Sequence, residues 1–187
     1  MKMLWRICRL VLIAAAAAVV GVITLVAFTP HDHKVELRVT YHNSPPAAVW
    51  RMLTDHASEP QWLPAFGSVE RQSDSAGRPV WIHRSPDGAF SATALTILEI
   101  PQRRYERLLL RDGQPASQSW DGRWVFELEP LGQGSRLLIT EYGWTDDFMF
   151  FLQQRFFASP HDFLVYYANR VGQALDDPAQ VEVIRSH

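Results

Sequence analysis

The stretch DDFMFFLQQRFFASPHDFLVYYANRVGQALDD, residues 146–177, has apolar residues at helical spacing. They recur at steps of three, four and seven: Phe148, Leu152, Phe156, Phe163, Tyr167, Val171 and Ala174. This spacing predicts a helix with one aromatic-rich face. Ser159 and Pro160, followed by Asp162, interrupt the pattern and are typical of a helix start. We therefore expect one long helix with a kink, or two helical segments that meet at Ser159.

The residues that precede this helix show strand patterns and one short helix. The clearest strand, 117–129, places Trp120, Trp124 and Phe126 on one face and charged residues on the other. Ser44 and Pro45 predict the start of the short helix. Turn-rich segments join the expected strands, which are 35–41, 66–71, 79–84, 90–100, 104–110, 117–129 and 136–143. We expect an α+β fold in which a curved antiparallel sheet of about seven strands wraps around the long C-terminal helix.

Length and charge exclude several classes of protein. The chain has 187 residues, with 18 basic and 20 acidic side chains and a net charge of −2. This length fits one globular domain and an accessory segment. A nucleic-acid binder normally has a basic face, so we expect no nucleic-acid partner. The single cysteine, Cys8, excludes a disulfide framework within the chain.

The N-terminal segment predicts a membrane anchor. The run of residues 10–30, which begins at Leu10 and ends at Pro30, has no charged residue and would span roughly 32 Å as a helix. Lys2, Arg6 and Arg9 precede it, so the N-terminus is expected in the cytoplasm. A cleaved signal peptide is the alternative, although no clean cleavage site follows the run.

These observations predict a single-pass membrane protein whose folded domain lies on the extracytoplasmic side, at the inner membrane if the source is bacterial. The expected divisions are an anchor at 1–30, a linker at 31–34, a folded domain at 35–177 and a C-terminal tail at 178–187. The sequence does not indicate an oligomeric state.

Three groups of segments resemble one superfamily. They are PAAVW (46–50) with LTD (53–55) and WLP (62–64), EIPQRR (99–104), and WVFELEP (124–130) with GSRL (134–137) and ITE (139–141). Their order and spacing resemble the START-like (helix-grip, SRPBCC) superfamily, in particular its polyketide cyclase/dehydrase and lipid-transport branch. The resemblance implies a cavity between the sheet and the C-terminal helix that holds an apolar or amphipathic molecule. It implies no particular reaction, because members include carriers, receptors and enzymes.

Aromatic side chains are the main candidates for the lining of such a cavity. We expect ligand-binding positions at Trp62, Trp81, Arg107, Trp120, Trp124, Phe126, Glu141, Phe156, Phe163 and Tyr167. Aromatic residues at these periods also fill cores, so a packed interior is the alternative for each of them. Indole and phenol groups would offer a ligand a few hydrogen bonds.

Two residues are candidates for proton transfer. Glu141 shares a strand face with Leu137 and Ile139 and is expected to point inward, where it would act as an acid or base or pair with an arginine. His83 would transfer protons near neutral pH or serve as a structural histidine. Arg107 would hold an anionic group of a ligand or form an ion pair.

We expect neither a metal nor a cofactor. His31, Asp32 and His33 lack a third or fourth ligand nearby and are interpreted as a linker. Asp55, His56 and Glu59 are interpreted as caps and solvated loop residues, and a position at a cavity entrance is the alternative. The sequence has no phosphate-binding loop and no pattern for covalent catalysis.

Three functions remain open. The first is membrane-tethered binding of a hydrophobic or lipid-like small molecule. The second is an enzyme of the polyketide cyclase/dehydrase type that acts on an apolar substrate. The third is an interaction scaffold in the envelope. Residues 148–152, which are apolar on every side, would form a lid, enter the bilayer interface or mediate self-association.

Overall fold

The computed structural model describes residues 2–28, 32–74, 76–111, 120–145, 159 and 161–186. The chain divides into two units, residues 1–31 and 32–187. The first unit contains a single described helix, α1 (Lys2–Phe28). The apolar segment 148–152 lies outside the described residues, so the lid, bilayer and self-association hypotheses for it stay untested.

The membrane prediction is wrong. In the part of the chain that the structure describes, no helix combines the length and apolar character needed to cross a membrane. The helix that forms over the uncharged run, α1, begins at Lys2, contains Arg6 and Arg9, and ends at Phe28. Charged side chains are costly within the hydrocarbon region. The predicted single-pass location and the predicted membrane tether at Leu10 to Pro30 are therefore both wrong.

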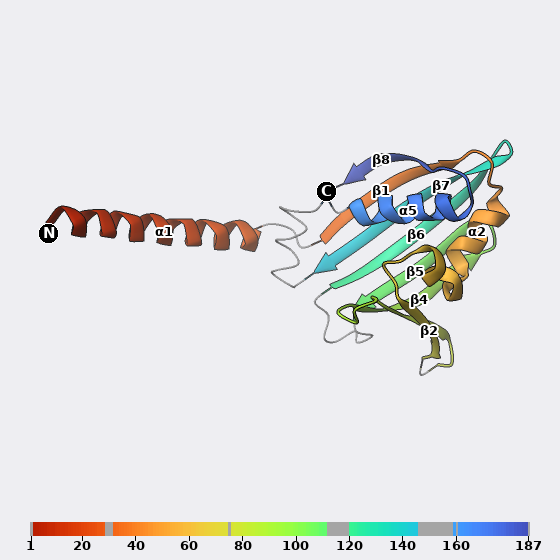
Figure 1. The fold of residues 1–187 in the computed structure, drawn as a ribbon, viewed down its shortest axis with the longest axis horizontal. Coiled ribbons are helices and arrows are strands. Elements are labelled where there is room, and N and C mark those ends of the chain that lie inside the picture. Colours follow the sequence, from red (N-terminus) through yellow and green to blue (C-terminus); the bar gives the residue numbers. More distant parts are fainter. Residues whose placement is uncertain are drawn as a thin grey trace. The chain divides into compact units, whose positions relative to one another are not determined.

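The second unit is an antiparallel sheet with helices over one face, as predicted. Eight strands are described, in the spatial order β2-β3-β4-β5-β6-β7-β1-β8 (Figure 1). Their bounds are β1 Asp32–Tyr41, β2 Ser68–Ser73, β3 Pro79–Arg84, β4 Ser91–Ile100, β5 Arg104–Arg111, β6 Trp120–Leu131, β7 Gly134–Thr145 and β8 Gln180–Ser186. Consecutive strands from β2 to β7 pair as neighbours. β1 closes onto β7, because the period-two pattern of Val35, Leu37 and Val39 buries one face of the strand.

Two boundaries differ from the prediction. The expected tail, 178–187, contains β8, which pairs antiparallel with β1 and raises the count from about seven strands to eight. The expected linker, 31–34, contains the start of β1 at Asp32. The Asp177 carboxylate accepts a hydrogen bond of 2.8 Å from the backbone N–H of Asn43 and so fixes the chain that leads into β8. A contact between residues this far apart in sequence leaves no local pattern.

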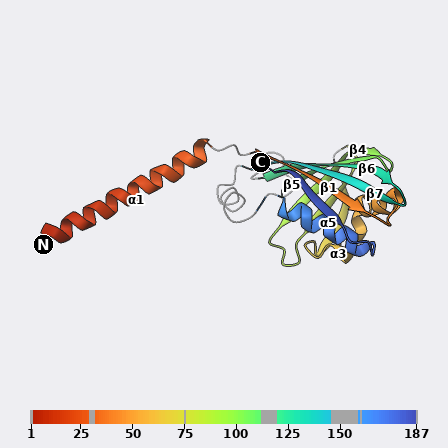
Figure 2. The same ribbon diagram turned by 90° about the horizontal axis from the view of Figure 1, so that it is seen from above.

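The helical elements lie on one side of the sheet (Figure 2). They are α2 (Pro46–Thr54), the 3₁₀ turn η1 (His56–Ser58), α3 (Glu59–Trp62) and α5 (Asp162–Ala174). Pro45 precedes the first helical residue of α2, where a proline costs no hydrogen bond. α5 corresponds to the second half of the predicted long helix, and its first half lies outside the described residues.

The core lies between α5, α2 and the concave face of the sheet. α5 buries Leu164, Tyr167, Ala168 and Val171, which confirms the inward positions predicted for Tyr167 and Val171. Phe163 and Ala174, predicted on the same face, are exposed. The Tyr41 hydroxyl donates a hydrogen bond of 3.0 Å to the carbonyl of Ala168, so β1 and α5 are joined by a buried polar contact as well as by packing.

Candidate functional site

A buried carboxylate lies at the centre of the interior. Glu59, the first residue of α3, has no exposed side-chain surface, and three other side chains donate to it. His56 Nδ1 lies 3.0 Å and Arg107 Nη1 3.1 Å from Oε1, while His83 Nε2 lies 2.7 Å from Oε2. We call Glu59, His56, His83 and Arg107 the Glu59 network. A buried charge persists only when it is paired and hydrogen-bonded, and here both conditions are met.

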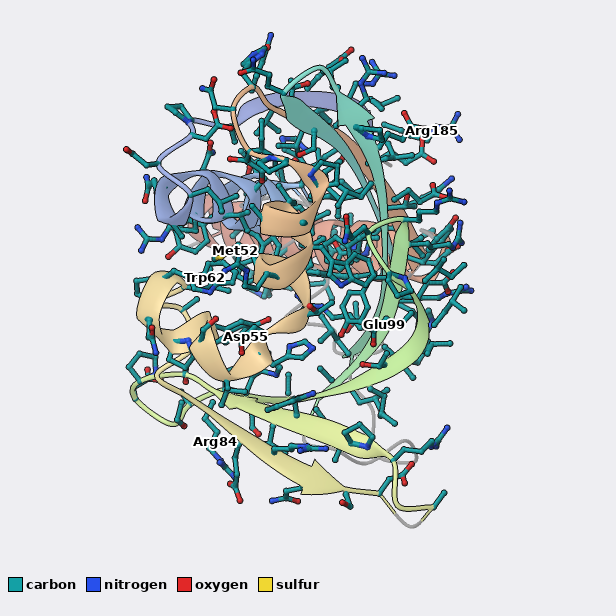
Figure 3. The ribbon with its side chains drawn as sticks, turned by 90° about the vertical axis from the view of Figure 1, so that its right-hand side faces the viewer. Met52, Asp55, Trp62, Arg84, Glu99 and Arg185 are labelled. Carbon is teal, nitrogen blue, oxygen red and sulfur yellow. The ribbon has the colours of Figure 1, made fainter. Side chains whose placement is uncertain are left out.

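The network joins elements that are distant in sequence. His56 comes from η1, His83 from β3 and Arg107 from β5, and all three side chains are almost fully buried. Figure 3 shows the helical layer that carries Trp62 facing the sheet that carries Glu99, with side chains filling the space between. The helical layer therefore supplies the carboxylate and one imidazole, and the sheet supplies the guanidinium and the other imidazole.

The hydrogen-bond directions follow from the charge of Glu59. An ionised carboxylate only accepts, so His56 Nδ1 and His83 Nε2 both carry protons. His56 Nε2 then accepts from the hydroxyl of Tyr105, 2.7 Å away. The Tyr105 oxygen lies 3.2 Å from Thr96 Oγ1, which can donate to it. His83 Nδ1 has no hydrogen-bond partner among the described residues.

Burial and pairing act in opposite directions on the pKa values of this network. Burial alone would raise the pKa of Glu59, but the hydrogen bonds from His56 and His83 and the charge of Arg107 hold this pKa well below its ordinary value. Burial lowers the pKa of His56, and its bond to Glu59 only partly offsets that effect. The network thus holds one negative charge on Glu59, compensated by Arg107, with His56 neutral.

An aromatic layer surrounds Arg107. Its guanidinium carbon lies 4.6 Å from the ring centroid of Trp124, 5.4 Å from that of Phe126 and 5.5 Å from that of Tyr167. Such contacts stabilise a cation that has been removed from water. Trp124, Phe126 and Tyr167 also contact one another at centroid distances of 5.5 to 6.1 Å, so the three rings pack as one group.

Four buried polar atoms have no hydrogen-bond partner among the described residues. They are Trp62 Nε1, His83 Nδ1, Arg107 Nε and the Tyr167 hydroxyl. The rings of Trp62 and Tyr167 are 5.5 Å apart, and the Arg107 guanidinium lies beside the Tyr167 ring. Trp62 and Arg107 can only donate. The unpaired donors Trp62 Nε1 and Arg107 Nε therefore belong to two side chains that both contact the Tyr167 ring.

Glu141 belongs to a second buried contact. It points inward, as predicted, and its Oε1 accepts a bond of 2.8 Å from Trp124 Nε1. Its Oε2 lies 3.9 Å from His33 Nε2. Both partners differ from the arginine that the sequence suggested. Strand register explains the arrangement, because Glu141, Trp124 and Arg107 lie opposite one another on β7, β6 and β5.

The structure places the other predicted site residues as follows. Trp62, Trp124, Phe126 and Tyr167 are buried, Trp81 is half-buried with its ring 5.2 Å from His56, and Phe163 is 40% exposed. Phe163 contacts Trp124 at 5.9 Å and forms the accessible side of the aromatic layer. Phe156 and the side chain of Trp120 lie outside what the structure describes, so both stay predictions.

His56 and Glu59 were misinterpreted. The sequence suggested solvated loop residues, but they are buried at 2% and 0% exposure. Their spacing of three residues places both on one side of a helical turn. This spacing, together with the apolar pair Trp62 and Leu63 that follows, was the sequence signal available for predicting their burial. The partners that make burial possible, His83 and Arg107, are supplied by distant strands.

The same three side chains are the candidate ligands of a metal. Ligand atoms of His56, Glu59 and His83 lie within 4.8 Å of one another. Two histidines and one carboxylate are a common donor set. However, both Glu59 oxygens already accept hydrogen bonds, and Arg107 places a positive charge against Oε1. A divalent cation would have to displace these protons and share the carboxylate with a guanidinium, so the charges favour the metal-free arrangement.

Elsewhere on the domain there is a groove with a largely charged lining. It has a volume of about 980 Å³ and is lined by arginines, acidic residues and prolines, among them Arg38, Arg103, Arg104, Arg136 and Glu129. None of the predicted ligand-binding residues lines it. It is therefore a separate feature from the Glu59 network.

Known structures share this fold. A conserved protein from Geobacillus kaustophilus superposes with a TM-score of 0.58 at 14% identity, covering 80% of this chain and 99% of its own. The fold is helix-grip. A norcoclaurine synthase point mutant from Thalictrum flavum, in complex with a transition-state analogue, gives 0.57 at 11% identity, covering 79% and 96%. Ara h 8.0201 gives 0.55 at 18% identity, covering 78% and 99%.

These likenesses confirm the START-like, Bet v 1-like architecture and show the fold alone. No family model matches the sequence. No curated protein matches it either. The helix-grip fold therefore rests on structure and not on sequence similarity.

Proposed function

We propose that this protein binds an amphipathic small molecule between the sheet and the helical layer. The apolar body of the molecule contacts Phe163 and Trp124, and an acceptor oxygen faces the donors around Tyr167. A carbonyl or carboxylate group has the right chemistry for these donors. Residues 35–177 form the binding unit in this proposal.

The observation that carries the proposal is the group of unpaired donors Trp62 Nε1, Arg107 Nε and Tyr167 O–H. More than about 90% of buried polar groups have a hydrogen-bond partner. Leaving one unpaired costs about 1–3 kcal/mol. A ligand oxygen would remove part of this cost, so the donors favour a ligand with an acceptor over a purely apolar one.

The fold supports the proposal by analogy only. A norcoclaurine synthase of the same fold holds a transition-state analogue, which shows that a helix-grip protein can bind a small organic molecule. An enzyme of the polyketide cyclase/dehydrase type is the second candidate, favoured by the buried His83. The unpaired donors do not favour a scaffold without a ligand.

The proposal is tested with a matched pair of ligands and one variant. 2-Tetralone and tetralin have the same bicyclic frame, and only the ketone has an acceptor. Titration followed by tryptophan fluorescence should show at least roughly tenfold tighter binding of the ketone, which corresponds to one strong hydrogen bond. Native mass spectrometry of the purified protein should also detect a co-purifying molecule.

Tyr167→Phe removes one unpaired hydroxyl and leaves the ring. We expect unchanged or slightly higher stability and a several-fold loss of ketone affinity. Tyr166→Phe, on the half-exposed neighbouring residue, is the control and should behave as wild type. Equal affinities for the two ligands, or wild-type binding by Tyr167→Phe, would contradict the proposal.

A further inference from the structure

The charged groove brings together four arginines from distant parts of the chain. They are Arg38 in β1, Arg103 in the turn between β4 and β5, Arg104 at the start of β5, and Arg136 in β7. Two glutamates of β6, Glu127 and Glu129, share the lining. The volume of about 980 Å³ lies within the range of small-molecule sites, which is about 300–1,000 Å³.

Half of these arginines are free to bind an anion. Arg38 and Arg104 form ion pairs with glutamates. Arg103 and Arg136 are exposed, and neither forms an ion pair within the part of the chain that the structure describes. A guanidinium keeps its charge at any physiological pH and can only donate hydrogen bonds. The groove therefore contains two cations whose donors are available to a ligand.

The backbone holds both arginines in place. The N–H of Arg103 donates to the carbonyl of Ile100 at 3.0 Å, and the carbonyl of Arg103 accepts from the N–H of Leu128 at 2.8 Å. Arg136 lies within β7, which pairs with β1 on one side and β6 on the other. Leu128 is opposite Leu137 in the register, so the two arginine backbones are about two strand spacings apart, roughly 10 Å. Two arginine side chains can reach one anion across that distance.

Apolar side chains form much of the remaining wall. They are Pro46, Pro101, Leu128, Pro130 and Leu138. Pro46 is the first residue of α2, and no side chain caps this end of the helix. The partial positive charge at the start of a helix adds to the charge of the arginines. The groove thus offers apolar contact next to positive charge.

Glu129 opposes the binding of an anion. It lies opposite Arg136 in the register of β6 and β7, but it forms no ion pair with a described residue. The unpaired charges of the lining are therefore those of Arg103, Arg136 and Glu129, with one net positive charge. This balance favours an anion over a cation.

We propose that this groove binds a soluble phosphate monoester with an apolar body. A guanidinium binds phosphate oxygens through parallel N–H donors. Two free guanidiniums match the three oxygens and the charge of roughly −2 that a monoester has at neutral pH, whereas a carboxylate has two oxygens and one charge. The apolar body contacts the prolines. This site is separate from the interior site of the proposed function, so either proposal can fail alone.

Calorimetric titration of the full chain tests the ligand class with three probes, which are phenyl phosphate, inorganic phosphate and phenol. We expect phenyl phosphate to bind at least about tenfold more tightly than the other two, because only phenyl phosphate has both the charge and the ring. Its affinity should decrease as NaCl is added. If phenol or inorganic phosphate binds as tightly as phenyl phosphate, the assigned ligand class is overturned.

Three variants locate the binding in the groove. Arg136→Gln and Arg103→Gln each remove a free guanidinium and should weaken phenyl phosphate binding by about tenfold. Glu129→Gln removes the opposing carboxylate and should strengthen it several-fold. All three side chains are exposed, so the variants should melt at the wild-type temperature.

Arg51→Gln is the matched control for loss of charge. Arg51 is exposed on α2, forms no ion pair with a described residue and does not line the groove. Its replacement changes the net charge as Arg136→Gln does, but phenyl phosphate should bind with wild-type affinity. Equal losses in Arg51→Gln and Arg136→Gln would show attraction to the overall charge of the protein and would overturn the site. Wild-type binding by both Arg103→Gln and Arg136→Gln would overturn it as well.

Discussion

At the scale of single residues, Glu59 has the largest predicted effect on folding. Three side chains from different elements donate to its carboxylate, and Arg107 supplies the compensating charge within the described network. Removing one partner of a buried ion pair leaves an uncompensated charge in a medium of low polarity. We expect Glu59→Gln to lower the free energy of unfolding by about 3–5 kcal/mol, measured by chemical denaturation.

Glu70→Gln is the matched control for Glu59→Gln. Glu70 pairs with Arg84 at 3.0 Å, but both side chains are about half exposed. Water screens such a pair, so its loss should cost only a small fraction of the Glu59 effect. Similar losses in the two variants would show that burial does not determine the contribution of Glu59.

Trp124 combines packing with a buried hydrogen bond. Trp124→Phe keeps an aromatic ring but removes the N–H that donates to Glu141 at 2.8 Å. Because a buried acceptor then loses its partner, we expect destabilisation of about 1–3 kcal/mol by thermal or chemical unfolding. Trp144→Phe, on the exposed face of β7, should change stability by roughly 0.5 kcal/mol or less. A larger loss at Trp144 than at Trp124 would contradict the assigned inner face.

At the scale of elements, the turn between β6 and β7 depends on a glycine. A Cβ on Gly134 would collide with the backbone carbonyl oxygens of Tyr41 and His42, at the end of β1. Backbone atoms cannot move away as a side chain can. We expect Gly134→Ala to separate β1 from β7 locally and to cost about 1–3 kcal/mol in unfolding experiments. Gln133→Ala, at the exposed neighbouring position, should be almost neutral.

At the scale of the whole molecule, the stability of the folded protein should depend on pH. Both the His56 and Glu59 pKa values are lower in the folded protein than their ordinary values of 6.5 and 4.5. The unfolded chain therefore binds more protons, and stability decreases as the pH falls below these ordinary values. We expect the melting temperature to decrease from pH 7 to pH 5 through His56, and more steeply below about pH 4.5 through Glu59.

His56→Asn isolates the first of these two steps. Asparagine keeps an N–H donor for Glu59 but does not titrate, so the decrease between pH 7 and pH 5 should become shallower. His42→Asn, at an exposed site, should leave the decrease unchanged. A melting temperature that is constant from pH 7 to pH 4 in the wild-type protein would contradict the assignment of a neutral His56.

The sequence by itself determined the architecture of the domain. Burial of one face of an element imposes a period on its sequence. The period-two pattern of Val35, Leu37 and Val39 therefore indicates the buried face of a strand, and the spacing of Tyr167 and Val171 indicates the buried face of a helix. The inward direction of Glu141 and Trp124 followed from the same rule. The membrane prediction was wrong, because no described helix combines the length and the apolar character needed to cross a membrane.

Only the tertiary structure decided the site. His56, Glu59, His83 and Arg107 are spread over 52 positions of the chain, and each alone resembles an ordinary polar residue. Their burial depends on mutual compensation of charge, which acts through space and leaves no period in the sequence. β8 was missed for the same reason, since its pairing with β1 is decided by distant contacts and not by its local pattern.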